Sequence, residues 1–359
     1  MKFSNEDYKS FEKFSQYFNE ILEEIEKVII FLKETLNKVD HFPKEMNHTS
    51  YAEFIGNFKQ KPINRKTPLD YSILAVDGSN FPVNEEIYLP FFGISVASVF
   101  EKFGEKPTFD RTSKFKLFYK PQEIFSEDGK LLTKEEINIK MLLEESKFLS
   151  KKLEDYKPHY ALFDGSLILW GLMSPLKYDP NNVVEFEKFI LKAKSLHIPI
   201  AGIISGSRSK EIINTLSLYL KENNFEKFVK YRSLINSIFD IQLMDKVLEN
   251  NSISSLFKVN KYLLKNYSEN IYFFFLKTEY EVLRVEIPEF VIDEIDRLST
   301  IVLDQVKKGA GYPVILQLAH QEAVINDEIK AFINNLIFKN YKDKNIFNQK
   351  LLSKLRKRI

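Results

Sequence analysis

The order of strand-like and helix-like segments between residues 71 and 222 constrains the fold of this chain more than any other feature. Three apolar runs come first, at residues 71–76, 87–100 and 113–125. A helix is predicted over 133–156, because Thr133 and Glu136 have the spacing of a capping box ahead of an amphipathic segment. The block therefore begins with three successive strands and then a helix.

Helices and strands alternate in the second part of this block. Apolar runs lie at 159–163 and 198–204, and each precedes a helix, predicted at 181–197 and 207–222. Three strands followed by helix, strand, helix, strand and helix is a ribonuclease H-like order. In that fold an antiparallel meander comes first, and later strands add in parallel through crossover helices. We therefore predict an α/β fold with a ribonuclease H-like core and a mixed central sheet.

Additions to this core are predicted at both ends of the chain. Residues 5–38 carry apolar side chains at alternating spacings of three and four, which predicts a long helix with a heptad seam. The seam either lies along the core of its own domain or mediates self-association. Towards the C-terminus, "IYFFFLK" and "YEVLRVEIP" predict a hairpin, and a helix ending at Gly309 follows. A short apolar run at 312–320 then opens into a helix from about 320 to 338.

These segments divide the chain into three parts. Residues 1–68 form an N-terminal helical segment and linker, residues 69–340 the α/β domain, and residues 341–359 a basic C-terminal tail. The formal net charge of +2 is nearly neutral, so any binding to nucleic acid depends on local basic patches.

Composition excludes several classes of protein. The absence of cysteine excludes disulfides, thiol nucleophiles and Cys-ligated zinc. The first residues lack the apolar core of a signal peptide, and no apolar stretch approaches the roughly 18 residues of a membrane span. We expect a soluble cytoplasmic protein without a membrane partner.

The tripeptide Asp-Gly-Ser occurs twice, each time directly after an apolar run. Asp77 follows the run at 71–76, and Asp164 follows the run at 159–163. In the predicted order these two strands are neighbours at the centre of the sheet, and ligands bind at the carboxyl ends of such strands. Two adjacent carboxylates repel each other unless a divalent cation lies between them. The repeat therefore favours a metal site over the alternative, which is two turns of ordinary composition.

Other side chains could complete such a site. The helix at 133–156 offers Glu144 and Glu145 as further oxygen ligands, and their spacing does not decide between them. His320 follows an apolar run and suits a metal ligand or a general base, although a helix cap or a buried structural histidine is the alternative. Tyr312, eight residues earlier, could orient phosphate or water, and packing is its alternative role.

Together these segments resemble the NurA nuclease family. The stretches "LAVDGSN", "ALFDGSLILWGL" and "GYPVILQLAHQEAVI" carry the resemblance, with a glutamate-bearing helix between the first two, and it runs from about residue 70 to 337. The resemblance implies that residues 69–340 form a ribonuclease H-like nuclease domain. It implies a phosphodiesterase that uses Mn²⁺, with Mg²⁺ as the other candidate, and acts as a 5′–3′ exonuclease and single-strand endonuclease on DNA. It also implies a homodimer that works beside a HerA-like hexameric translocase in the resection of double-strand break ends.

The resemblance also assigns roles to individual residues. The catalytic set that it implies is Asp77, Glu145 or Glu144, Asp164, Tyr312 and His320. The implied metal ligands are Asp77, Glu145, Asp164 and His320. Relatives often carry a lysine soon after the fifth strand; here Arg208 and Lys210 lie further along and are predicted to contact DNA phosphates.

Two other functions stay open from the sequence. One is a non-catalytic dimeric partner that guides DNA for a motor ATPase. The complete set of carboxylates argues against it. The other is a ribonuclease H-like ATPase, which usually needs more glycine-rich phosphate loops than the 11 glycines of this chain suggest.

Overall fold

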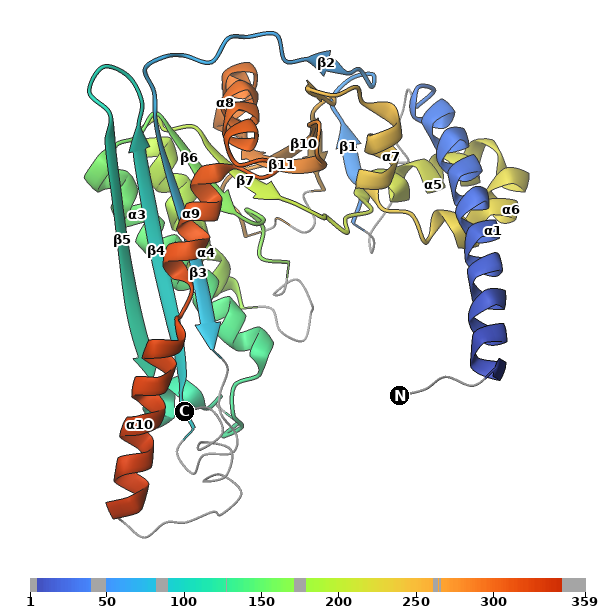
Figure 1. Ribbon diagram of the computed structural model, residues 1–359. Helices are drawn as coiled ribbons and strands as arrows, with labels where there is room; N and C mark the ends of the chain where they lie inside the picture. Colours follow the sequence, from blue (N-terminus) through green and yellow to red (C-terminus); the bar gives the residue numbers. More distant parts are fainter. Residues whose placement is uncertain are drawn as a thin grey trace. The chain divides into compact units, whose positions relative to one another are not determined.

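A computed structural model of the chain (Figure 1) contains two compact units, identified by their internal contacts. The residues that the structure describes are 5–39, 50–81, 90–126, 128–170, 179–260, 264 and 266–343. Unit 1 comprises the residues up to Thr67, Gly165–Leu167 and Ala201–Tyr312. Unit 2 comprises Pro68–Asp164, Ile168–Ile200 and the residues from Pro313 onward.

The sheet of unit 2 confirms the predicted order of strands. Its strands are β3 (Ser72–Phe81), β4 (Phe92–Lys102), β5 (Thr108–Phe118) and β6 (Tyr160–Asp164), arranged in the order β6-β3-β4-β5. The strands β3, β4 and β5 form an antiparallel meander. The later strand β6 joins β3 in parallel, with the pairs running from Ile73↔Tyr160 to Val76↔Phe163. The core of this unit is therefore the mixed sheet of an α/β fold.

Helices cover both faces of β3. The helices of unit 2 are α2 (Pro121–Ile124), α3 (Lys134–Tyr156), α4 (Pro180–Ser195), α9 (Val314–Ala323) and α10 (Asp327–Asp343). Both α3 and α9 pack against β3 and β4, and α4 packs against α3 (Figure 1). Successive strand residues point to opposite faces of a sheet. Asn80 contacts α3 and Ser79 contacts α9, so the two helices lie on opposite faces of β3.

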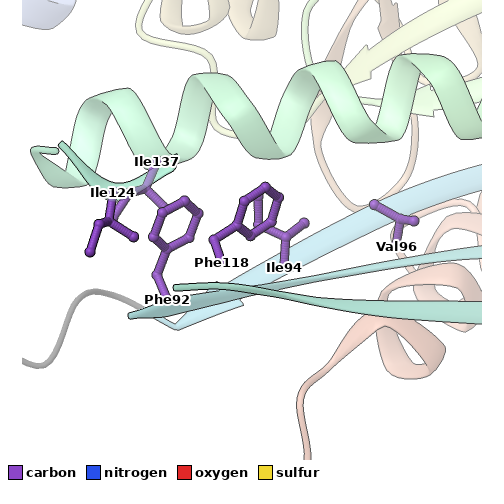
Figure 2. Close-up of a cluster of buried hydrophobic side chains, with 6 residues drawn as sticks. All are labelled: Phe92, Ile94, Val96, Phe118, Ile124 and Ile137. Carbon is purple, nitrogen blue, oxygen red and sulfur yellow. The ribbon is translucent and has the colours of Figure 1, made fainter. Parts of the chain in front are cut away.

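The helix α3 begins at the predicted capping box and covers an apolar cluster. Thr133 accepts a hydrogen bond from the Glu136 amide at 3.3 Å, and the Glu136 carboxylate accepts one from the Thr133 amide at 2.7 Å. The cluster (Figure 2) consists of side chains from β4, β5, α2 and the start of α3, namely Phe92, Ile94, Val96, Phe118, Ile124 and Ile137. This cluster fixes α3, and every side chain on its inner face, against the sheet.

Unit 1 contains a second group of strands. They are β1 (Ala52–Phe54), β2 (Lys61–Pro62), β7 (Ile200–Ile204), β8 (Ser252–Ile253), β9 (Phe257–Val259), β10 (Ile271–Lys277) and β11 (Val282–Pro288). The order β1-β9-β10-β11-β7 is antiparallel throughout, and β8 pairs with both β10 and β2. The pairing of β10 with β11 confirms the predicted hairpin.

The long N-terminal helix is confirmed. The helices of unit 1 are α1 (Asn5–Leu36), α5 (Glu211–Asn223), α6 (Phe225–Ile235), α7 (Asp240–Val247), the 3₁₀ helix η3 (Glu289–Glu294) and α8 (Ile295–Lys308). The second half of α1 buries Val28, Leu32 and Leu36, and α1 packs against α5, α6 and α7. Phe14 and Phe18, on the first half of the seam, are exposed. The seam thus serves the core of its own unit over half its length.

Two predicted boundaries are wrong. The strand predicted at 113–125 ends at Phe118, and the short helix α2 follows. The apolar run at 312–320 is not a lead-in to a helix from 320 but is itself the helix α9, which begins at Val314. Its buried residues Ile315, Leu316, Ala319 and Ala323 have helical spacing, which a short apolar run does not distinguish from a buried strand. The first residues of the run predicted at 87–100 lie outside the described residues.

No helix within the described residues is long and apolar enough to cross a lipid bilayer.

Candidate active site

The two aspartates lie on adjacent parallel strands. The last pair of the β3–β6 ladder is Val76↔Phe163, so Asp77 and Asp164 both follow it directly. Neighbouring strands are about 4.8 Å apart, which places the two backbones side by side at this point. Asp77 does not end its strand as predicted, because β3 continues to Phe81 and Asp77 pairs with Ala97 of β4. Asp164 does end β6, where Gly165 has a φ of 120° and turns the chain.

Glu145 of α3 is buried beside these aspartates. It is 1% exposed, and its Oε1 atom has no hydrogen-bond partner among the described residues. A Cβ atom added to Gly78 would lie 2.3 Å from that Oε1. The glycine of the first Asp-Gly-Ser therefore provides space for the Glu145 carboxyl group, rather than a turn.

The two aspartates act on the carboxyl group of Glu145. Burial raises the pKa of Glu145 well above its usual range, and the charges of Asp77 and Asp164 raise it further. Burial also raises the pKa of Asp77, while the Gly78 amide and His320 oppose that shift. Removing such a carboxyl group from water is costly unless a cation compensates its charge.

His320 contacts Asp77 directly. The His320 Nδ1 atom lies 2.7 Å from Asp77 Oδ2. The His320 side chain is 61% exposed and that of Asp77 only 11%, so a surface histidine contacts a largely buried carboxyl group. His320 lies inside α9 and not at the predicted junction between a strand and a helix. Its helix nevertheless packs on the strand that carries Asp77.

The remaining predicted residues have contacts of other kinds. Glu144 is partly exposed and pairs with Lys116 Nζ at 3.5 Å, so it does not share the environment of Glu145. Tyr312 belongs to unit 1, where its hydroxyl donates to the Ile203 carbonyl at 3.3 Å. Arg208 is exposed, whereas Lys210 donates to the Asn236 carbonyl and lies over the Phe239 ring. The roles of Tyr312, Arg208 and Lys210 stay predictions.

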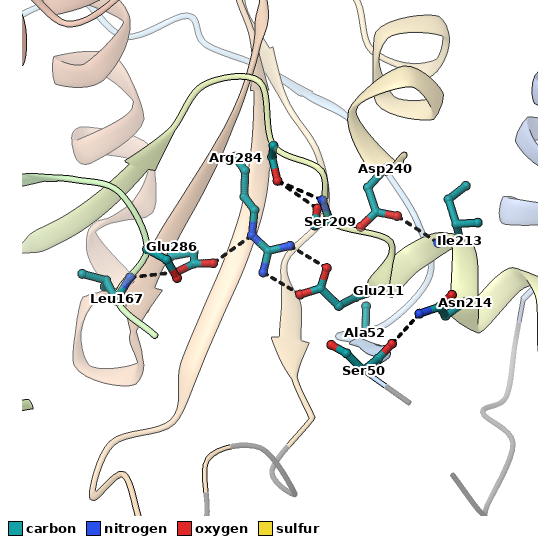
Figure 3. Close-up of polar contacts among 12 residues, drawn as sticks. Ser50, Ala52, Leu167, Ser209, Glu211, Ile213, Asn214, Asp240, Arg284 and Glu286 are labelled. Carbon is teal, nitrogen blue, oxygen red and sulfur yellow. Dashed lines mark hydrogen bonds and ion pairs between the residues drawn. The ribbon is translucent and has the colours of Figure 1, made fainter. Parts of the chain in front are cut away.

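The second Asp-Gly-Ser is anchored by a buried ionic cluster in unit 1 (Figure 3). Glu286 Oε2 accepts hydrogen bonds from the Ser166 hydroxyl at 2.7 Å and the Leu167 amide at 2.9 Å. Glu286 Oε1 accepts from Arg284 Nε at 2.9 Å, and the other guanidinium nitrogens donate to Glu211 at 3.0 Å. We did not predict this cluster. Its one signal in the sequence is a pair of charged residues inside the apolar strand β11.

Asp240 lies beside this cluster and is fully buried. Its Oδ1 accepts a hydrogen bond from the Ile213 amide at 2.9 Å, and its Oδ2 has no partner among the described residues. Burial first, and then the charge of Glu211, raise the pKa of Asp240 from its ordinary 3.8 to about 7, although Arg284 opposes the shift.

Asp240 makes the stability of the protein depend on pH. Because the folded state holds the proton more tightly, the free energy of unfolding should fall as pH rises from about 4 to about 7. Asp240→Asn is expected to remove this fall and to stabilise the protein at pH 8 by more than about 1 kcal/mol. Urea unfolding at pH 5 and pH 8 measures the effect. Asp245→Asn, an exposed carboxylate of the same helix, is the control, and equal pH dependence in both variants would contradict the prediction.

The site fits a divalent cation in donor chemistry and in burial. Carboxylate oxygens and an imidazole are ligands that Mn²⁺ accepts, and Mg²⁺ takes carboxylates. The unpartnered Oε1 of Glu145 is the kind of atom that a cation would compensate. No three His, Asp or Glu side chains of the described residues form a cluster that could hold a metal ion.

The fold is a mixed α/β sheet in which two aspartates directly follow the last pair of a parallel ladder between neighbouring strands. The chain belongs to the NurA family, because residues 71–325 match the NurA domain. No curated protein matches the sequence.

Among solved structures, one with a TM-score above 0.5 shows the same fold. The NurA nuclease from Sulfolobus solfataricus is 18% identical, with a TM-score of 0.51 over 92% of this chain and 98% of that chain. A structure described as NurA bound to dAMP and manganese is 14% identical, with a TM-score of 0.43 over 89% of this chain and 94% of that chain.

Proposed function

We propose that this protein is a metal-dependent nuclease that hydrolyses phosphodiester bonds of DNA. One observation carries the proposal: the buried carboxyl group of Glu145, with an oxygen unpartnered among the described residues, lies near enough to Asp77 and Asp164 for their charges to raise its pKa, and both aspartates directly follow the last pair of the parallel β3–β6 ladder. A structural role gives no reason to bury a carboxyl group whose pKa two neighbouring aspartates raise further. Membership of the NurA family supports the same activity.

The residues divide into those that hold a metal ion and those that handle protons. Asp77, Glu145 and Asp164 would hold the ion through their carboxylate oxygens. When bound, a divalent ion lowers the pKa of water and neutralises charge on the scissile phosphate.

His320 contacts Asp77 through Nδ1, so its Nε2 is the ring nitrogen that can bind the ion or exchange a proton. The ring reaches solvent, so a proton taken up at Nε2 can leave without crossing the core.

The metal, the type of nuclease activity and the partners that we propose are supported by the family and by the donor atoms of the site. One nitrogen and several oxygen donors suit Mn²⁺, with Mg²⁺ as the alternative. Family membership supports a nuclease domain at 69–340, a homodimer, 5′–3′ exonuclease and single-strand endonuclease activity, and work beside a HerA-like translocase at break ends. Arg208 is exposed and suits a contact to the DNA backbone, whereas Lys210 already binds a carbonyl of its own unit.

The test is an assay of DNA degradation with Mn²⁺ or Mg²⁺, with and without EDTA. We expect metal-dependent degradation, and Asp164→Asn should slow it by more than about 100-fold, because even outer-shell partners of metal ligands are worth about 10–100-fold. Asp327→Asn, a fully exposed carboxylate of the same unit, is the control and should keep full activity.

Two results would refute the proposal. The first is no degradation by the unaltered protein with either metal, which would favour a DNA-guiding partner or, if ATP binds, an ATPase. The second is an Asp164→Asn variant as active as its control.

A further inference from the structure

Ser79, the serine of the first Asp-Gly-Ser, joins β3 to the end of α9. Its hydroxyl donates a hydrogen bond to the Ala323 carbonyl at 2.6 Å and accepts one from the Ile325 amide at 3.3 Å. Ala323 is the last residue of α9. The carbonyls of a last helical turn have no partner within the helix, so Ser79 satisfies one of them and the amide just beyond.

The same strand and helix carry the pair of His320 and Asp77. Asp77 and Ser79 are two residues apart, so both point to the α9 face of β3. On α9, His320 lies one turn before Ala323. The strand therefore contacts the helix twice, once through the site and once through the serine.

We infer that Ser79 is a positioning residue that holds His320 against Asp77. This inference rests on the proposed function of the site. The helix α9 has only ten residues, so fixing its last turn fixes the turn that carries His320. A small displacement of a catalytic group is costly, because reacting groups must keep their geometry.

The other polar anchor of α9 near this end is weaker. Arg111 of β5 pairs with Glu322 at 2.6 Å, but the arginine side chain is 63% exposed. Ion pairs exposed to solvent hold their partners weakly. The half-buried hydroxyl of Ser79 is thus the contact that orients the end of the helix.

Two variants and a matched control test the inference. Ser79→Ala removes both hydrogen bonds, and Ser79→Thr keeps the hydroxyl on a residue that suits a strand. Ser95→Ala is the control, because Ser95 lies directly opposite on β4 and makes no hydrogen bond to α9 within the described residues. Two quantities are measured for each protein: backbone amide exchange of residues 314–323, and kcat and KM for metal-dependent DNA hydrolysis.

In Ser79→Ala we expect amide exchange in α9 to rise about fivefold, the effect of one or two lost hydrogen bonds. We expect kcat to fall about 10-fold with little change in KM, as for the loss of an outer-shell partner. Ser79→Thr should recover most of both losses, and Ser95→Ala should resemble the unaltered protein.

The exchange measurement needs no nuclease activity, so it separates this inference from the proposed function. If the unaltered protein does not cut DNA, the proposed function fails while exchange still decides whether Ser79 holds α9. Unchanged exchange in Ser79→Ala, a normal kcat in that variant, or a threonine variant as impaired as alanine would overturn the inference.

Discussion

Glu145→Gln is expected to abolish DNA hydrolysis and, without metal, to make the protein more stable. Glutamine keeps the size of the side chain but cannot carry the negative charge that a divalent ion requires. The loss of activity should be roughly 100-fold to 1000-fold, the scale for losing one group that stabilises charge at an active site.

The gain in stability comes from the burial of the Glu145 carboxyl group, which is costly when no metal ion compensates its charge. Glu145 is 1% exposed and has an unpartnered oxygen among the described residues, while burial, Asp77 and Asp164 oppose its ionisation. A glutamine side chain at this position is neutral, so the two aspartates no longer oppose its charge. Denaturant unfolding of the metal-free protein at neutral pH should show a gain of about 1–2 kcal/mol, the range for a buried polar group left without a partner.

Glu144→Gln is the matched control, one residue away on the same helix. Glu144 pairs with the exposed Lys116 at 3.5 Å, and such pairs contribute about 0–1 kcal/mol. Its replacement should leave activity unchanged and should not stabilise the protein. The comparison therefore decides between the two glutamates, which their spacing in the sequence leaves equal. Loss of activity in Glu144→Gln with retention in Glu145→Gln would reverse the assignment.

Local signals in the sequence predicted most of the elements. The capping box of Thr133 and Glu136 predicted the start of α3, and the order of apolar runs and helical segments predicted the meander and the parallel strand β6. These signals depend on residues a few positions apart, so a single sequence is enough to reveal them. The helix α9 was misjudged because a short apolar run fits a strand and a buried helix equally well.

Long-range placement was harder to predict. The neighbouring positions of Asp77 and Asp164 followed from the strand order, since both residues directly follow the last pair of one parallel ladder. Which side chain of α3 reaches them depends on the rotation of a helix about its axis, which packing alone sets. The cluster around Arg284 joins Glu211 and Glu286 across unit 1, and no local spacing marks such contacts.

The two copies of Asp-Gly-Ser require glycine for different reasons. Gly165 of the second copy has a φ of 120°, so the backbone there requires glycine. Gly78 lies inside β3 and is not among the residues with positive φ. Its lack of a side chain matters for space, because an added Cβ would lie 2.3 Å from Oε1 and 2.8 Å from Cγ of Glu145.

Gly78→Ala is therefore expected to displace Glu145 from the aspartates. Activity should fall by about 100-fold, as for a misplaced catalytic group, and overpacking should cost about 1–3 kcal/mol of stability. In a Glu145→Ala background there is no carboxyl group for the added Cβ of Gly78→Ala to displace. There it should be neutral or slightly stabilising, because alanine suits a strand interior better than glycine. Unfolding of the four proteins in this double-mutant cycle measures the coupling, and an equal cost of Gly78→Ala in both backgrounds would contradict the steric explanation.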